Sequence, residues 1–190
     1  YKDSLAGWEG TGNMNLPGLT TRAIGRNWLP LESVGSTNDY CKENAMTLPH
    51  GSAVTTCNQT AGKGRLGRQW DKTVGKGLAL SVLLHDWPVE SLGQLPLLMG
   101  IAACDGLQAL CGAPCAVKWS NDILLENKKL CGILCESRIG GGRAFAVAGI
   151  GVNLAQTQED WDRLGLLYAA SLFSVTGKKV GAAETAAAIC

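Results

Sequence analysis

The alternation of apolar and polar positions predicts a series of short strands. In residues 77–84, Leu78, Leu80, Val82 and Leu84 recur at every second position, which is the period of a strand with one buried face. Residues 52–57 read as another strand. Gly140, Gly141 and Gly142 predict a turn, and so do residues 86–93. Further strands are predicted over residues 116–119, 123–126, 129–137 and 144–153, with a hairpin turn at Asn127-Lys128.

Helices are predicted at three places by capping and breaking residues. Ser36, followed three positions later by Asp39, resembles a capping arrangement, so a helix is expected over residues 37–46 that stops before Pro49. Pro96 suits the first turn of a long helix that ends near residues 110–112. Residues 157–190 read as helical with a break at Gly177.

Together these segments predict an α+β fold rather than alternating β-α-β units, because hairpin-linked strands outnumber the separate helices. Residues 1–20 lack periodicity and are rich in Gly, Thr and Asn, so they are predicted to form an irregular arm. The arm is too short to be a helix-turn-helix domain. Residues 21–190 are predicted to form one domain.

Composition narrows the class of protein. Of the 190 residues, 46% are hydrophobic and the formal net charge is +1, which argues against a general nucleic-acid binder. No uninterrupted apolar run reaches about 18 residues, so no membrane span is expected. The eight cysteines lie mostly in apolar segments without nearby histidines, so we expect buried thiols, no metal site and a reducing, cytoplasmic location.

The most informative segment is Gly62-Lys63-Gly64-Arg65-Leu66-Gly67-Arg68-Gln69-Trp70, called the basic loop below. Glycines let backbone N–H groups approach a ligand, cations suit a phosphate or carboxylate, and a Trp offers a face to an aromatic base. A basic surface turn remains an alternative. The glycine spacing also fits a dinucleotide fingerprint, but the polar flanks lack the apolar strand and helix that such a site requires.

Two other clusters carry candidate chemistry. Lys118 lies between two short strands and either extends into solvent from a hairpin or faces a cleft, where it would stabilise a developing negative charge. Gly149 and Gly151 leave two gaps on one face of a strand, which a ligand or another part of the chain can fill.

Taken in order, the motifs resemble those of the biotin protein ligases over roughly residues 24–190. The matching segments are Ser36-Thr37-Asn38, Gln59 to Trp70, Lys118-Trp119-Ser120-Asn121-Asp122, Lys129-Leu130-Cys131-Gly132-Ile133-Leu134 and Gly149-Ile150-Gly151-Val152-Asn153. The resemblance implies a mixed, largely antiparallel sheet with flanking helices, like the class II aminoacyl-tRNA synthetases. It also implies an enzyme that uses biotin, ATP and Mg²⁺ to make biotinyl-5′-AMP, and then transfers biotin to a lysine of a biotin carboxyl carrier domain.

By position, the resemblance implies a role for each matched residue. Lys118 and Arg65 would be catalytic. The biotin-binding residues would be Ser36, Thr37, Asn38, Gln59, Gly62, Lys63, Gly64, Arg65, Lys118, Gly132, Gly149 and Gly151. The nucleotide-binding residues would be Arg65, Arg68, Trp70, Asn121 and Asn153.

Departures from the family pattern leave alternatives. Lys63 stands where Arg is usual, which keeps the charge but loses bidentate geometry, and Ser120 stands where Pro is usual. The chain stops before the family's usual C-terminal β-barrel, so we expect a truncated catalytic domain. A homodimer is possible, and no DNA partner is expected. A lipoate or octanoate ligase, or a biotin-binding fragment without turnover, remain the alternatives.

Overall fold

The fold is built on one mixed seven-stranded sheet. The computed structural model describes residues 14–70, 73–140 and 143–190. Its strand order is β1-β2-β3-β7-β6-β5-β4; β1 and β2 are parallel, and every other neighbouring pair is antiparallel. The strands are β1 (Trp28–Pro30), β2 (Ala53–Thr56), β3 (Gly77–Pro88), β4 (Cys115–Lys118), β5 (Asp122–Leu125), β6 (Lys128–Gly140) and β7 (Arg143–Asn153).

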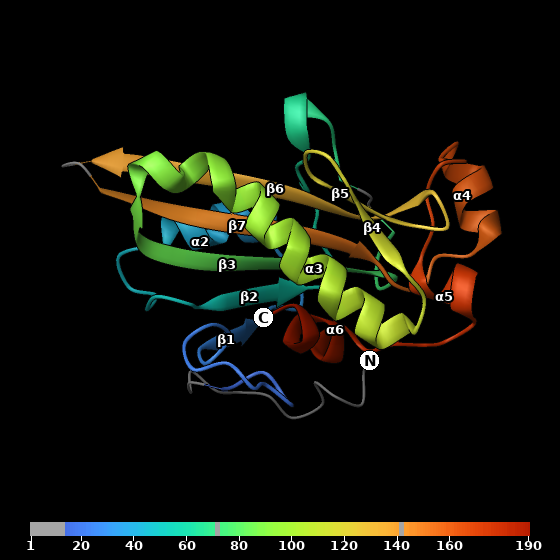
Figure 1. Cartoon of the computed structure of the whole chain (residues 1–190), viewed down its shortest axis with the longest axis horizontal. Coiled ribbons are helices and arrows are strands. Elements are labelled where there is room, and N and C mark those ends of the chain that lie inside the picture. Colours follow the sequence, from blue (N-terminus) through green and yellow to red (C-terminus); the bar gives the residue numbers. More distant parts are fainter. Residues whose placement is uncertain (1–13, 71–72, 141–142) are drawn as a thin grey trace.

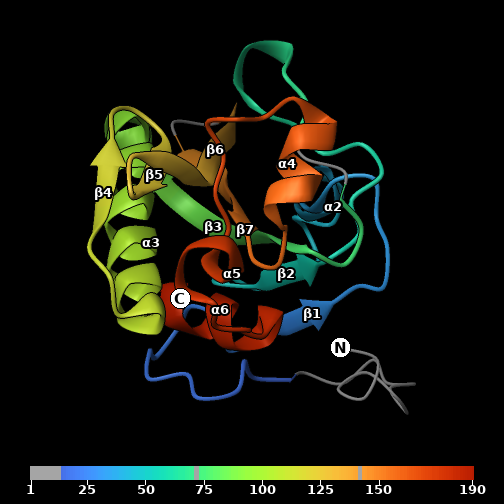
Figure 2. The same ribbon diagram turned by 90° about the vertical axis from the view of Figure 1, so that its right-hand side faces the viewer.

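Helices flank both faces of this sheet, as Figures 1 and 2 show. The long helix α3 crosses one face and packs against α6, while α2 and α4 lie on the opposite face (Figure 2). The helices are α2 (Thr37–Glu43), α3 (Leu95–Cys111), α4 (Gln158–Leu164), α5 (Leu172–Thr176) and α6 (Ala182–Ile189), with 3₁₀ turns η1 (Arg65–Gly67) and η2 (Val89–Gln94). The predicted class, a largely antiparallel sheet with flanking helices, is confirmed.

Strand β3 shows why the core has two layers. Its predicted apolar face, from Leu78 to Leu84, packs into the cluster beneath α3 and α6. On the other face, Leu83 packs with Cys41 of α2 and with Val54 and Val147 of the neighbouring strands. A strand buried on both faces reads as a nearly continuous apolar run, which explains the sequence of this segment.

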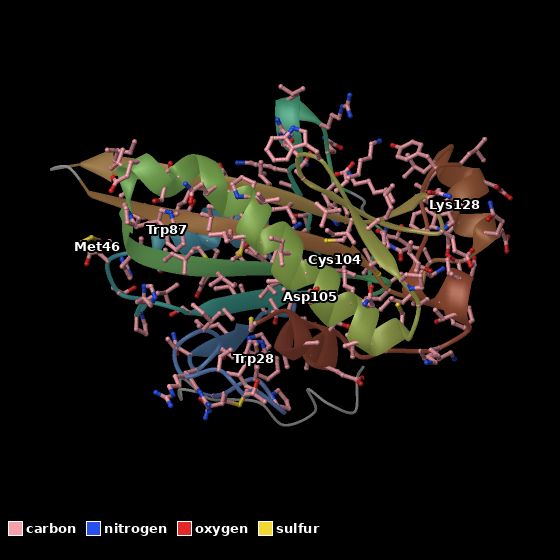
Figure 3. All side chains as sticks on the ribbon, viewed as in Figure 1. Trp28, Met46, Trp87, Cys104, Asp105 and Lys128 are labelled. Atoms are coloured by element: carbon pink, nitrogen blue, oxygen red, sulfur yellow. The ribbon has the colours of Figure 1, made fainter. Side chains whose placement is uncertain are left out.

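The core begins earlier in the chain than the predicted domain boundary. Leu16 is only 2% exposed and belongs to the main apolar cluster, and Met14 pairs with Trp28 at the start of β1. Trp28 itself is labelled on β1 in Figure 3. Residues 14–20 thus contain no helix or strand, although Leu16 joins the core, and residues 1–13 of the predicted arm lie outside the described part.

Several predicted element boundaries also differ. Helix α2 ends at Glu43, with Asn44 as its C-cap, instead of reaching residue 46. The segment predicted as a turn over residues 86–93 instead continues β3 to Pro88 and enters η2, after an irregularity between Leu84 and Trp87.

The helical tail is broken twice. The predicted break at Gly177 is confirmed, and a second lies at Gly165; both glycines adopt the left-handed conformation that ends a helix. Of the turn predicted at residues 140–142, residues 141 and 142 lie outside the described part.

All eight cysteines are free thiols. Cys41, Cys111 and Cys131 are buried as predicted, whereas the other five, including Cys104 on α3 (Figure 3), are only partly buried. Burial raises the pKa of the Cys41 thiol to about 12, which keeps it protonated. By length and composition alone, the segment Val89–Cys111 could cross a membrane, but core helices of soluble proteins also meet these two criteria. In this structure the segment packs against the sheet and α6.

Candidate functional site

A cleft of about 700 Å³ opens on the face of the sheet that carries α2, and its size suits a small-molecule site. It brings together segments that are far apart in the sequence: the start of α2, the basic loop, the β4–β5 turn and the middle of β6 and β7. Gly62 alone among the predicted site residues is not part of its lining. The predicted residues that line the cleft are Ser36, Thr37, Asn38, Gln59, Lys63, Gly64, Arg65, Arg68, Trp70, Lys118, Asn121, Gly132, Gly149, Gly151 and Asn153.

One end of the cleft carries uncharged polar groups. Ser36 caps α2, and the Thr37 backbone N–H donates to Gln59 Oε1 at 2.8 Å. The Thr37 hydroxyl lies 3.2 Å from the same oxygen. Gln59 Nε2 makes no hydrogen bond to any described residue, so it can donate to a ligand carbonyl.

Ser81, which was not among the predicted site residues, hydrogen-bonds to two side chains at this end of the cleft. Its fully buried hydroxyl lies 2.7 Å from Thr37 Oγ1 and 2.6 Å from Asn38 Oδ1. Asn38 Nδ2 in turn donates to Leu134 O at 3.1 Å and to Glu136 Oε2 at 2.8 Å. A serine within an otherwise apolar strand was the available signal, because a buried hydroxyl needs a partner.

The glycines of β6 and β7 are close to side chains of this chain. A Cβ at Gly149 would lie 2.3 Å from Asn38 Oδ1. A Cβ at Gly151 would lie 2.4 Å from the Trp70 ring, and one at Gly132 would lie 2.7 Å from it. The glycine spacing left a ligand or another part of the chain to fill the gaps at Gly149 and Gly151. In the structure Asn38 and Trp70 lie against these glycines, so the glycines make room for two side chains that line the cleft.

The basic loop is a short hairpin that projects from the sheet (Figures 1 and 2). Lys63 pairs with Gln69, the Gly64 N–H donates to Arg68 O at 2.7 Å, and the Trp70 N–H donates to Gly62 O at 3.1 Å. A Cβ at Gly62 would lie 2.9 Å from Gln59 Nε2, which explains a glycine here although it does not line the cleft.

Two cations fasten this loop to opposite walls of the cleft. Lys63 Nζ lies 2.6 Å from Asp39 on α2, and Arg65 Nη1 donates to Ser120 Oγ and to Asn121 Oδ1 in the β4–β5 turn. Burial alone would raise the pKa of Asp39, but hydrogen bonds from Lys63 and Lys42 outweigh it and lower that pKa.

Lys118 ends β4 at the rim of the cleft, with its side chain exposed. Its ammonium makes no hydrogen bond or ion pair with any residue in the described ranges, so it is available to an anion.

Lys129, at the start of β6, is a lining residue to which the sequence analysis gave no role. Its Nζ lies 2.7 Å from Asp122 and 5.6 Å from the centre of the Trp70 ring. Its position at the head of the quoted segment Lys129 to Leu134 was the available signal.

The amide of Asn153 makes several hydrogen bonds within the chain. Its Nδ2 donates to Ala170 O at 2.9 Å and to Lys129 O at 3.3 Å, and Gln156 Nε2 lies 3.4 Å from its Oδ1. The side chain is 4% exposed. Its amide thus joins the end of β7 to β6 and to the segment after α4, and the nucleotide contact of this lining residue stays a prediction.

The charge of the cleft selects an anion. Among the described lining residues, Asp122 is the one carboxylate, and it is paired with Lys129. No group of three or more His, Cys, Asp or Glu side chains in the described ranges could hold a metal ion. Cations, a Trp and a polar end suit a ligand with an anionic centre, an aromatic ring and a compact polar head. The lining cations are Lys63, Arg65, Arg68, Lys118 and Lys129.

Comparisons with known proteins agree with this geometry. Residues 31–153 match the model of the Biotin/lipoate A/B protein ligase family. The chain is 35% identical over 166 residues to the bifunctional ligase/repressor BirA of Bacillus spizizenii, covering 86% of this chain and 51% of that protein. It is 36% identical over 148 residues to the biotin–[acetyl-CoA-carboxylase] ligase of Mycobacterium tuberculosis, covering 73% and 54%.

Among solved structures, the biotin protein ligase of Aquifex aeolicus in complex with biotin and ATP is similar, with a TM-score of 0.72 and 31% identity. The similarity covers 85% of this chain and 66% of that chain. The chain spans about half the length of the Bacillus and Mycobacterium proteins that it matches.

Proposed function

The chain belongs to the biotin/lipoate A/B protein ligase family, and from that premise we propose that it activates biotin with ATP to biotinyl-5′-AMP. It then transfers biotin to a lysine of a biotin carboxyl carrier domain. The protein is thus proposed to be a ligase of the biotin–[acetyl-CoA-carboxylase] type, the name carried by the Mycobacterium relative.

The observation that carries the proposal is the combination of groups that line one cleft. Uncharged donors and acceptors around Thr37 and Gln59 line it together with Lys118 and the cations of the basic loop. Biotin has a compact ureido head that needs several hydrogen bonds, and a carboxylate that becomes a mixed anhydride with phosphate.

The residues that line the cleft have distinct proposed roles. Gln59 Nε2 and the hydroxyls of Ser36 and Thr37 orient the ureido ring. Lys118, whose ammonium has no partner among the described residues, neutralises charge as the biotin carboxylate attacks the α-phosphate of ATP and pyrophosphate leaves. The cations of the basic loop hold the resulting adenylate by charge-assisted hydrogen bonds.

The nucleotide end is proposed to lie against Trp70 and Arg68. The Trp70 ring rests on Gly132 and Gly151, so its place is fixed by the glycines of the sheet rather than by the loop alone. Asn121 is proposed to act through Arg65, because its Oδ1 accepts from the guanidinium.

Mg²⁺ remains a prediction. It would neutralise the phosphates of ATP, and Asp122 is the one carboxylate that the described lining offers it. Because Asp122 is already paired with Lys129, these residues fit a cation that arrives with the nucleotide better than one bound by the protein beforehand.

The carrier domain as partner, the absence of a DNA partner, a homodimer and a cytoplasmic location also remain predictions. The near-neutral formal charge of +1 supports an ordinary soluble protein rather than a DNA binder. Eight free cysteines support a reducing compartment.

Calorimetric titration with biotin and, separately, with lipoate tests the proposed substrate. Biotin should bind and lipoate should not. Binding of lipoate in place of biotin would instead assign the chain to the lipoate branch of the family. The parallel measurement with Ser33→Ala serves as control, because Ser33 is exposed and its hydroxyl donates to Asn58 O, outside the cleft.

A further inference from the structure

The contact between the basic loop and the β4–β5 turn uses one nitrogen of Arg65. Nη1 carries two hydrogens; one points to Ser120 Oγ and the other to Asn121 Oδ1, at 3.0 Å. The remaining three donors, on Nη2 and Nε, make no hydrogen bond to any residue in the described part of the chain. The guanidinium is thus fixed through Nη1, while Nη2 and Nε can donate hydrogen bonds to an anion.

The acceptors on the turn are themselves fixed. Asn121 Nδ2 donates to Ile133 O at 3.2 Å, and the Ile133 N–H donates to Asn121 O at 2.8 Å. The amide plane of Asn121 is therefore set by β6, with its oxygen turned toward Arg65. Ser120 adds the second acceptor, without which Nη1 would keep one bond and the guanidinium could rotate about it.

The position of Ser120 couples this contact to the reaction centre. It lies two residues beyond Lys118, and both residues line the cleft together with Arg65. A hydrogen bond across the mouth therefore joins the strand end that carries Lys118 to the loop that covers the adenylate.

We propose that Ser120 is a positioning residue that latches the basic loop through Arg65. Its hydroxyl orients the guanidinium so that Nη2 and Nε face an anion in the cleft. The proposal deepens the proposed function, on which its second readout rests, but the latch itself is a property of the ligand-free protein.

The latch is tested by hydrogen–deuterium exchange of the peptide that covers residues 62–70 in the ligand-free protein. Ser120→Ala should speed exchange of the amides bonded within the hairpin about threefold to tenfold, the range expected for losing one exposed charge-assisted hydrogen bond. Ser120→Thr keeps the hydroxyl and should restore slow exchange. Ser33→Ala, which changes an exposed serine outside the cleft, should match the parent.

A double-mutant cycle separates positioning from a general effect on the turn. In an Arg65→Ala background, Ser120→Ala should add nothing to the exchange rate, because both changes break the same contact. Unchanged exchange in Ser120→Ala, or an equal acceleration in the two backgrounds, would overturn the latch.

The second readout is the escape of biotinyl-5′-AMP from the protein. Ser120→Ala should release it about threefold to tenfold faster than the parent, and Ser120→Thr should retain it as the parent does. A parent that forms no adenylate would contradict the proposed function, yet the exchange experiment would still decide the latch.

Discussion

Gly149→Ala provides a quantitative test of how the sheet supports the cleft. The added Cβ would lie 2.3 Å from Asn38 Oδ1 and 2.8 Å from both Cγ and Nδ2, closer than any real Cβ contact. Asn38 cannot simply turn away, because Leu134 O, Glu136 and Ser81 hold both ends of its amide.

The expected cost follows from these contacts. Overpacking in a core costs about 1–3 kcal/mol, and each hydrogen bond lost by Asn38 adds about 0.5–1.5 kcal/mol. A methyl group on a strand offsets about 0.5–1 kcal/mol of this by restricting the unfolded chain. We therefore expect Gly149→Ala to lower the free energy of unfolding by about 2–4 kcal/mol and to weaken biotin binding, since Asn38 is displaced from the cleft wall.

Urea unfolding and biotin calorimetry measure the two effects. Gly100→Ala in α3 is the matched control, because its Cβ would lie at ordinary distances of 3.6 Å from Val117 and 3.8 Å from Ile133. That variant should be more stable than the parent by about 0.5–1 kcal/mol and bind biotin equally. A Gly149→Ala protein with the parent's stability and affinity would refute the reasoning.

Two further predictions follow from charged groups. Arg65→Gly should release biotinyl-5′-AMP about tenfold faster and so biotinylate bystander proteins, which a streptavidin blot detects. Arg26→Gly removes an exposed arginine outside the cleft and should not increase this labelling. Equal labelling by the two variants would contradict a role of Arg65 in retaining the adenylate. The Lys76 ammonium holds the pKa of Asp160 at about 2, below the ordinary 3.8, so its stabilisation is full above pH 4 and is lost as pH falls toward 2. In thermal unfolding, Asp160→Asn should thus be less stable than the parent at pH 7, and this difference in stability, on the order of 2 kcal/mol, should disappear at low pH. Asp162 is exposed, so the stability of Asp162→Asn relative to the parent should not change with pH in this way. A stability difference for Asp160→Asn that is independent of pH would contradict its ionic origin.

Local sequence signals predicted most elements, whereas the candidate site residues were assigned by the resemblance to the biotin protein ligases. The alternation from Leu78 to Leu84, the Ser36 cap and Pro96 each act over a few residues, so they can be read directly from the chain. The boundaries that moved depend on tertiary contacts. Strand β3 continues to Pro88 because β7 pairs with it that far, and no local pattern carries this information.

The role of each residue in the cleft was harder to predict than which residues line it. The spacing of Gly149 and Gly151 indicated that something packs against β7, but only the fold shows that Asn38 and Trp70 do so. The hydrogen bonds of Asn153 likewise depend on the fold. Its amide looked available at the end of a strand, and the segment after α4, distant in sequence, occupies it through Ala170.

Biotin-dependent release of pyrophosphate from ATP tests the central claim most directly. The parent chain should release pyrophosphate only when both biotin and ATP are present. Lys118→Ala should slow release about 10²–10³-fold while still binding biotin in the calorimeter, because it removes a charge that acts on the transition state. Lys179→Ala, which removes an exposed lysine outside the cleft, should match the parent. Release by Lys118→Ala at the parent rate, or no biotin-dependent release by the parent, would contradict the account.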